Sequence, residues 1–383
     1  MNSQAIKDKF KAIFQTEPLM LRSPGRINLI GEHTDYNDGF VFPAAIDKEV
    51  HFALAKNSID KFRFYAFDLN ESFEMNINEL SKSNTSWANY LLGVVAQYQK
   101  VGLVIDAGID CVFGGNIPMG AGLSSSAAIE NGFAYAINVL FNFSVDKLQM
   151  VKMAQKAEHE YAGVMCGIMD QFASMYGQEN NALKLDCRTL DYIYANVNMK
   201  DYGIVLCDSN VKHELASSEY NARRKECQQG VAIMKKHDSK ITALRDISIE
   251  MLEEHKSEFD SVVFKRCAYV VKENKRVEEA FAALQKNNNE KFGELMYQSH
   301  EGLRDEYEVS CSELDVLFSL ARKSSSVIGA RMMGGGFGGC TINLVKREQM
   351  ESFAEHIAKD YYEITGKETD IHFVQIANGT GLL

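Results

Sequence analysis

The sequence lacks several features that would assign it to a common protein class. No apolar run reaches the ~18 residues that a membrane-spanning helix needs, and the first residues lack the apolar core of a secretory signal. The eight cysteines form no C-x-x-C pair, which argues against a zinc site and favours reduced thiols. Positive charge is not in excess, because the net charge is −11, so a nucleic-acid surface is not expected. We therefore expect a cytoplasmic protein without membrane or nucleic-acid partners, and we further expect a monomer.

The length and the order of the patterns predict two domains. A chain of 383 residues is too long for one ordinary core, and 46% hydrophobic with 24% charged residues is typical of a globular protein. Strand–helix alternation near both ends surrounds a mainly helical middle, which predicts an α+β fold. No internal repeat appears, and no linker rich in glycine, serine or proline marks the boundary.

Hydrophobic periodicity and breaker residues give the expected elements. Strands are predicted at 27–30, 62–67, 72–77, 111–113, 182–185, 203–207, 327–332, 341–345 and 371–376. Helices are predicted at 1–14, 87–101, 124–140, 145–161, 217–236, 247–256, 258–286, 289–306, 312–323 and 348–364.

The segment PGRINLIGEHTDYN, residues 24–37, carries the first candidate site. The apolar run 27–30 stops at a glycine and is followed at once by Glu32, His33 and Asp35. Polar side chains so close behind a buried strand need hydrogen-bond partners, and a polyhydroxylated ligand supplies many. A polar turn between two strands is the alternative, but two further glycine-rich elements favour a site.

The second element extends from Gly114 to Leu140. Pro118, Gly120 and Gly122 interrupt regular structure, and three serines at 124–126 then open an alanine-rich helix. The unpaired N–H groups at the start of a helix, with its dipole, form an anion site that suits phosphate. The loop is not a Walker A loop, because no Lys-Ser or Lys-Thr pair follows its glycines. An ordinary serine N-cap is the alternative.

The third element is GGGFGG, residues 334–339. It formally matches the dinucleotide fingerprint G-x-G-x-x-G, but that fingerprint must follow a strand and open a helix. Here the strand-like run 341–345 follows immediately, and the next helical pattern starts near residue 348. A glycine-rich hairpin, or a loop packed beside another backbone, is therefore the better interpretation.

In this order, the three elements resemble the GHMP kinase superfamily and, within it, the galactokinase family. GRINLIGEHTDYN resembles the galactokinase signature, PMGAGLSSSAA the phosphate loop, and MGGGFGG the C-terminal glycine motif of that family. Two further stretches agree, at 157–174 and 207–224. The resemblance covers essentially the whole chain, and five motifs in the right order are specific.

The resemblance implies a two-domain GHMP kinase fold with the active site between the domains. An N-terminal α/β domain, similar to ribosomal protein S5, would span residues 1–190 and hold the sugar signature and the phosphate loop. A C-terminal α+β domain would span residues 191–383 and hold the GGGFGG motif, with the last strand returning to the N-terminal domain.

The resemblance also implies an activity and a set of site residues. The activity is ATP-dependent phosphorylation of α-D-galactose at its anomeric C1 hydroxyl, with ATP and Mg²⁺ as cofactors. Asp170 would be the catalytic base, and Arg26 would keep it ionised and stabilise the transferring phosphoryl group. The implied sugar pocket comprises Glu32, His33, Asp35, Gly167, Asp170 and Tyr220. The implied ATP site comprises Gly120, Ala121, Gly122, Leu123, Ser124, Ser125 and Ser126, and the implied Mg²⁺ ligands are Ser126 and Glu158.

Several alternatives remain open at this point. A kinase for N-acetylgalactosamine or another pyranose typically departs from the signature at the positions of Thr34 and Asn37, and both residues are present here. A non-catalytic galactose sensor typically shortens the serine-rich loop, which is complete here. For Glu158 the alternative is a solvated helix face, and the basic run 223–225 is predicted to be such a face. Glu160 and the C-terminal tail receive no role.

Overall fold

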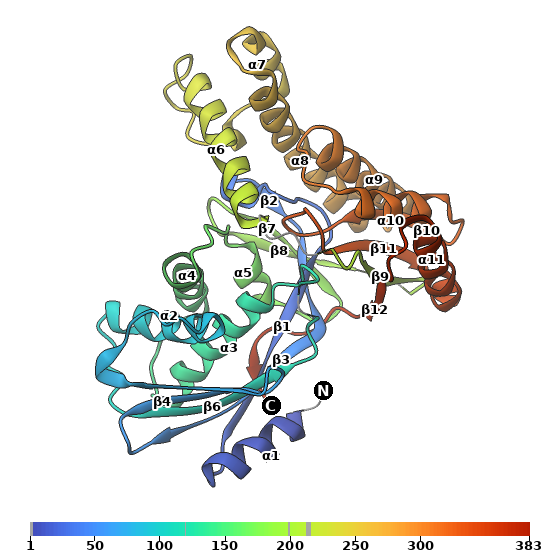
Figure 1. Cartoon of the computed structure of the whole chain (residues 1–383). Helices are drawn as coiled ribbons and strands as arrows, with labels where there is room; N and C mark the ends of the chain where they lie inside the picture. Colours follow the sequence, from blue (N-terminus) through green and yellow to red (C-terminus); the bar gives the residue numbers. More distant parts are fainter. Residues whose placement is uncertain (1–2, 119, 198–199, 212–215) are drawn as a thin grey trace.

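The computed structural model describes residues 3–118, 120–197, 200–211 and 216–383. This part of the chain contains three β-sheets and eleven α-helices (Figure 1). The helices are α1 (Ser3–Phe14), α2 (Ser86–Lys100), α3 (Ser125–Leu140), α4 (Lys147–Ala157), α5 (Met169–Tyr176), α6 (Ala216–Met234), α7 (Ile249–Glu254), α8 (Ser261–Gln285), α9 (Asn289–Asp305), α10 (Ser312–Lys323) and α11 (Met350–Thr365). The strands are β1 (Leu19–Asn28), β2 (Phe40–Val41), β3 (Pro43–Asn57), β4 (Lys61–Ala66), β5 (Glu71–Asn76), β6 (Gly108–Gly115), β7 (Asn181–Asp186), β8 (Tyr192–Asn196), β9 (Tyr202–Asp208), β10 (Val327–Met332), β11 (Cys340–Lys346), β12 (Asp370–Val374) and β13 (Gly381–Leu382).

A six-stranded sheet in the order β13-β1-β3-β6-β4-β5 carries the N-terminal half. Its strands pair antiparallel except for β4 and β6, which are parallel. Side chains alternate across it: Phe52 and Leu54 of β3 pack under helices α2 to α5, whereas Ala53 and Ala55 pack against α1 on the other face (Figure 1).

A four-stranded antiparallel sheet in the order β10-β11-β9-β12 carries the C-terminal half. Ile204 and Leu206 of β9 share a core with α8 and α9, and Val205 and Cys207 face α10 and α11. Both faces are therefore buried, which explains the nearly continuous apolar runs that predicted these strands.

The N-terminal and C-terminal halves share an apolar core in addition to being connected by the chain. Ile27 and Leu29, which adjoin the end of β1, lie in the same apolar cluster as Met333 and Ile342. The C-terminal tail returns to the first half, where β13 pairs with β1 and the backbone of Ala377 bonds to that of Ala45. Helices α6 and α7 project from this body together with one end of α8 (Figure 1).

Most predicted elements are confirmed within a few residues, including α10 and β10 at the predicted limits. The sequence analysis missed β2, β3, α5, β8 and β13, and the strand predicted at 27–30 overlaps only the end of β1. It also extended the helix at 145–161 past its α-helical end at Ala157. The predicted solvated face at 223–225 is wrong for Arg223, which is buried and donates to the carbonyls of Tyr307 and Glu308. The boundary near residue 190 stays a prediction. None of the described helices is long and apolar enough to cross a membrane.

Candidate active site

Arg26 joins three separate segments at one end of β1. The pairing of β1 with β3 shifts register between Pro24 and Arg26. The guanidinium donates two parallel bonds to Asp170, from Nε at 2.8 Å and from Nη2 at 2.9 Å. Its Nη1 donates to the carbonyl of Gly122 in the phosphate loop at 2.6 Å. Such bidentate geometry is the strongest form of arginine–carboxylate pairing, so Arg26 fixes strand, loop and helix relative to one another.

Asp170 lies in the first turn of α5, where the helix dipole favours a negative charge. Its Oδ2 accepts a further bond from Ser124 Oγ at 2.6 Å, so three donors hold the carboxylate. Burial alone would lower the pKa of Arg26, but the Asp170 carboxylate raises it. The Asp170 carboxylate faces a pocket, and Arg26 lies almost fully enclosed behind it.

Glu32 connects the first motif to the third. It follows a turn at Gly31, whose φ of +99° is strained for any residue with a Cβ. Its Oε1 accepts from Arg331 Nη2 at 2.7 Å and from the backbone N–H of Gly334 at 2.9 Å. Burial raises the pKa of Glu32, and the Arg331 charge opposes that effect. The GGGFGG loop thus positions a carboxylate of the signature motif.

His33 is held as a neutral imidazole. Burial lowers the pKa of His33 to about 3. Its Nε2 lies 3.2 Å from the carbonyl of Gly335, and a carbonyl can only accept, so Nε2 carries the proton. Nδ1 must then accept from the Tyr36 hydroxyl at 2.7 Å, and Tyr36 in turn is bonded to Tyr307. Both ring nitrogens therefore have partners within the protein, and a direct bond from His33 to a ligand stays a prediction.

Asp35 and Gly167 lie against each other. A Cβ built on Gly167 would come within 1.7 Å of Asp35 Oδ2, so only glycine allows this carboxylate its position. Burial raises the pKa of Asp35 to about 7, and repulsion from the Asp170 carboxylate adds to the shift. The two neighbouring carboxylates thus differ: Asp170 is paired with the Arg26 cation, whereas Asp35 accepts a hydrogen bond from the uncharged N–H of Tyr36.

Tyr220 brings α6 to the same place. Its ring centroid lies 5.3 Å from that of His33 and 5.3 Å from that of Tyr36, which makes it part of an aromatic wall. Burial raises the pKa of Tyr220 well above its usual value, so the hydroxyl remains protonated and can donate. The projecting helix α6 therefore contributes to the pocket through its first turns.

The phosphate-loop segment interrupts regular structure, as the sequence predicted. Gly120, Gly122 and Ser124 have φ values of +82°, +74° and +59°, and α3 begins immediately after Ser124. Ala121 and Leu123 are buried, so the loop is anchored by its apolar residues. Free N–H groups at the start of α3 provide the kind of site that binds phosphate. Met119, within the matched motif, lies outside the described residues.

Glu158 is buried rather than on a solvated face, so that alternative is wrong. It opens a π-helical turn that follows α4. Its Oε1 accepts from Ser126 Oγ at 2.9 Å, and its Oε2 accepts from Gln171 Nε2 at 2.6 Å. A carboxylate and a hydroxyl oxygen side by side are donors that suit a hard cation such as Mg²⁺. Glu160, by contrast, bonds to Gln97 and Lys100 outside this site.

These side chains enclose a cavity of about 140 Å³. Its lining residues are Arg26, Glu32, His33, Asp35, Glu158, Val164, Cys166, Gly167, Met169, Asp170, Tyr220, Gly334 and Gly335. All residues predicted for the sugar pocket and both predicted catalytic residues are among them. The phosphate loop does not line the cavity but reaches its wall through the bonds of Gly122 and Ser124.

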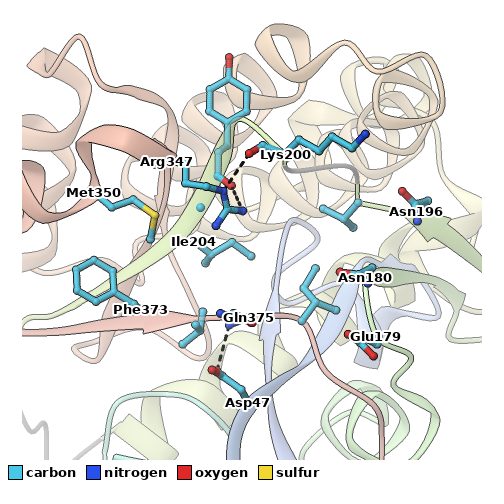
Figure 2. Close-up of a pocket in the computed structure, with 15 residues that line it drawn as sticks. Asp47, Glu179, Asn180, Asn196, Lys200, Ile204, Arg347, Met350, Phe373 and Gln375 are labelled. Carbon is cyan, nitrogen blue, oxygen red and sulfur yellow. Dashed lines mark hydrogen bonds between the residues drawn. The ribbon is translucent and has the colours of Figure 1, made fainter.

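A larger cavity, of about 520 Å³, lies elsewhere (Figure 2). Asp47, Arg347, Met350, Phe373 and Gln375 are among its lining residues, and none of the predicted site residues is. Arg347 is engaged there with the carbonyls of Lys200 and Tyr202, and the Gln375 N–H with Asp47 (Figure 2). The small cavity is the better candidate because it combines paired charges, an anion-binding loop and a carboxylate of raised pKa.

Sequence reasoning missed the residues that hold this site in place. Arg331 is fully buried and donates to the carbonyls of Asn28 and Leu29 as well as to Glu32. Gln171 bridges Glu158 and Glu130 from a fully buried position. Gln171 lies within the stretch 157–174, next to Asp170, and Arg331 lies three positions before Gly334. That proximity to the motifs was the available signal.

Comparison with known proteins first defines the class. The family model described as "GHMP kinases N terminal domain" matches residues 89–178, and that described as "GHMP kinases C terminal" matches residues 280–363. A mevalonate kinase structure, 22% identical, shares the fold with a TM-score of 0.65 over 94% of this chain and 99% of that one. The fold and the site thus define a kinase of the GHMP superfamily.

More specific matches narrow the assignment. The model described as "Galactokinase galactose-binding signature" matches residues 8–56. A galactokinase of Clostridium beijerinckii is 44% identical over 99% of this chain and 98% of its own length, and one of Thermosipho africanus is 42% identical over 94% and 99%. The structure of Lactococcus lactis galactokinase complexed with galactose has a TM-score of 0.96 at 37% identity, covering 99% of both chains. The chain belongs to the galactokinase family.

Proposed function

We propose that this chain transfers the γ-phosphoryl group of ATP to the anomeric C1 hydroxyl of α-D-galactose, giving galactose 1-phosphate and ADP. The observation that carries the proposal is the Arg26–Asp170 pair, which faces the small polar pocket on one side and is bonded to the phosphate loop on the other. A sugar in the pocket would thereby lie next to a phosphate held at the start of α3.

Asp170 is the proposed base. As the sugar oxygen forms its bond to the γ-phosphorus, the bond from that phosphorus to the β–γ bridging oxygen breaks, and the hydroxyl proton passes to the Asp170 carboxylate. Three donors hold the carboxylate in place, and any aspartate is a weak base for a sugar hydroxyl. Positioning and electrostatic stabilisation by Arg26 would therefore supply more of the rate enhancement than early proton removal.

The sugar site is assigned to Glu32, His33, Asp35, Gly167 and Tyr220 together with Asp170. A half-protonated Asp35 and a protonated Tyr220 hydroxyl can both donate and accept, which suits a ring with several hydroxyl groups. A buried polar group that loses its partner costs roughly 1–3 kcal/mol, so two lost contacts would favour galactose over glucose by about 10²- to 10³-fold.

Ser126 and Glu158 are the proposed ligands of Mg²⁺, because their oxygens are adjacent and of the type that this cation prefers. When bound, Mg²⁺ would neutralise charge on the β- and γ-phosphates of ATP. Gln171 would orient Glu158 towards the cation, and the N–H groups of the phosphate loop would hold the phosphates. We further propose that the protein acts on these small molecules as a monomer in the cytoplasm.

The decisive experiment measures ADP release with MgATP and galactose, N-acetylgalactosamine, glucose, mannose or arabinose as acceptor. Galactose should have the highest kcat/KM. Asp170→Asn should fold normally, because the change is nearly isosteric, but lose about 10²-fold or more of kcat. Comparable efficiency on glucose and galactose would reject the assigned sugar, and full turnover by Asp170→Asn would reject the assigned base.

A further inference from the structure

A second cluster of possible metal ligands lies at the projecting end of the helical region, near the end of α6 and next to α7 (Figure 1). It consists of His237, three residues after α6, His255, directly after α7, and Glu258, which ends the short 3-10 turn Lys256–Glu258. None of these residues lines the candidate active site. The function proposed above therefore leaves the cluster without a role.

The three side chains converge on one point. Glu258 Oε1 lies 2.9 Å from His237 Nε2 and 3.2 Å from His255 Nδ1. One nitrogen from each ring and a carboxylate oxygen all lie within 4.8 Å of one another. The two imidazole rings stack with centroids 3.7 Å apart. Both rings thus present a nitrogen to the same carboxylate.

The backbone holds these residues in place before any ligand arrives. The N–H of His237 bonds to the carbonyl of Met234, which continues the last turn of α6. The N–H of Glu258 bonds to the carbonyl of His255, so these two ligands belong to one turn. Each side chain is also partly exposed, with 23% to 40% of its surface accessible, so an ion can reach it from solvent.

The donor set selects a class of metal. Two imidazoles and one carboxylate form the protein ligands of many zinc sites, with water in the fourth position. Imidazole suits Zn²⁺, Ni²⁺ and Cu²⁺, whereas Mg²⁺ and Ca²⁺ prefer oxygen donors. Ligands at ~2.1 Å around a tetrahedral ion lie about 3.4 Å apart, so the nitrogen–oxygen distances of 2.9 and 3.2 Å would lengthen by about 0.5 and 0.2 Å when an ion enters.

We propose that His237, His255 and Glu258 form a site for a divalent transition metal of the Zn²⁺ type. The metal would replace the two hydrogen bonds to Glu258 and fasten the end of α6 to the turn that follows α7. At its other end, α6 carries Tyr220 of the sugar pocket, so the ion would stiffen a helix that borders the active site.

The test uses the full chain after removal of bound metal. The protein is titrated with ZnCl₂ in competition with a chromogenic chelator. Excess Mg²⁺ is present to occupy the proposed Mg²⁺ site at Ser126 and Glu158. One Zn²⁺ per chain should bind at micromolar concentration or below and raise Tm. His237→Asn, His255→Asn and Glu258→Gln should each weaken binding by about tenfold or more. His356→Asn, which changes an exposed histidine of α11 outside the cluster, should leave binding unchanged.

Two further measurements separate the possible outcomes. Metal-free variants should keep the ADP-release rate of the unchanged chain, because no cluster residue touches the pocket, and their Tm should not rise with Zn²⁺. The nearly isosteric Glu258→Gln serves if a histidine variant misfolds. Unchanged Zn²⁺ affinity and stoichiometry in the His237→Asn/His255→Asn double variant, or no saturable Zn²⁺ binding by the unchanged chain, would overturn the proposal.

Discussion

Replacing Asp35 by asparagine should stabilise the ligand-free protein while removing its activity. Burial and the neighbouring Asp170 raise the pKa of Asp35 from 3.8 to about 7. Between these pH values the folded state keeps a proton that the unfolded state has lost. Raising the pH through this window therefore favours unfolding, and above about pH 7 the folded protein carries the full cost of an ionised Asp35. The asparagine side chain has the same shape but carries no charge, so the variant avoids this cost.

The size of the effect follows from the pKa. One pKa unit is worth ~1.36 kcal/mol, so the whole difference corresponds to about 4 kcal/mol. Asp35 is only half-buried, and solvent screening reduces this to about 1–3 kcal/mol. An unfolding entropy of ~2.1 cal/mol/K per residue gives about 0.8 kcal/mol/K for this chain, so Tm should rise by roughly 1–4 °C at pH 8.

The assay is thermal unfolding of both proteins from pH 5 to pH 8 without ligand. The Tm difference should be about 40% of its full size at pH 5 and reach its full size near pH 8, because all other titrating groups are shared and cancel. Asp38→Asn, three positions away and in a surface ion pair with Arg188, should show no such growth. A Tm difference that is absent at pH 8, or equal at all pH values, would refute the reasoning. Galactose phosphorylation by Asp35→Asn should fall sharply, with ATP affinity retained.

Three further substitutions test individual contacts. Gly167→Ala would place a Cβ 1.7 Å from Asp35 Oδ2 and so displace that carboxylate. We expect kcat/KM for galactose to fall by about tenfold or more. An unchanged value would mean that sugar binding does not depend on the position of the Asp35 carboxylate. Gly122→Val, at a φ of +74°, should weaken ATP binding more than galactose binding, as measured by calorimetry. The control Gly366→Val, at a φ of +69° in open space, should alter neither affinity. Equal weakening of both ligands would mean that the loop has a structural role and does not bind phosphate. Gln171→Met removes the 2.6 Å bond to Glu158 and should raise the Mg²⁺ concentration for half-maximal rate by about 10–100-fold. Electron paramagnetic resonance should show a parallel loss of Mn²⁺ binding. An unaltered Mg²⁺ dependence would mean that Gln171 does not support the metal site.

The sequence predicted the elements that have a strong period and failed where the period is interrupted. Strand β10 and helix α10 were predicted at their observed limits because their apolar residues recur regularly. Strand β3 was missed because Asp47, Lys48 and Glu49 interrupt its apolar pattern, and the tertiary pairing with β1 and β6 overrides that local signal.

In the candidate site, too, the sequence predicted what depends on local residue order and failed for contacts between distant parts of the chain. Local order predicted that Glu32, His33 and Asp35 would follow a buried strand, and the structure brings them to one cavity. No spacing rule could show that Arg331 would bond to Glu32, since the two are 299 positions apart. Nor could it reveal that both nitrogens of His33 would be engaged by Tyr36 and Gly335, because such bonds arise only from packing.

The return of the C-terminal tail to the first sheet has a consequence for how the protein is made. Leu21 pairs with Leu382, which is 361 positions later in the chain. At ~5–20 residues per second, a ribosome needs roughly 20–70 s to synthesise that interval. During this time the outer edge of β1 has no partner, and the hydroxyl of Ser23 lacks Thr380, to which it is bonded at 2.8 Å in the finished fold. The nascent N-terminal half therefore carries an open strand edge that can pair with another chain, and its final closure is post-translational.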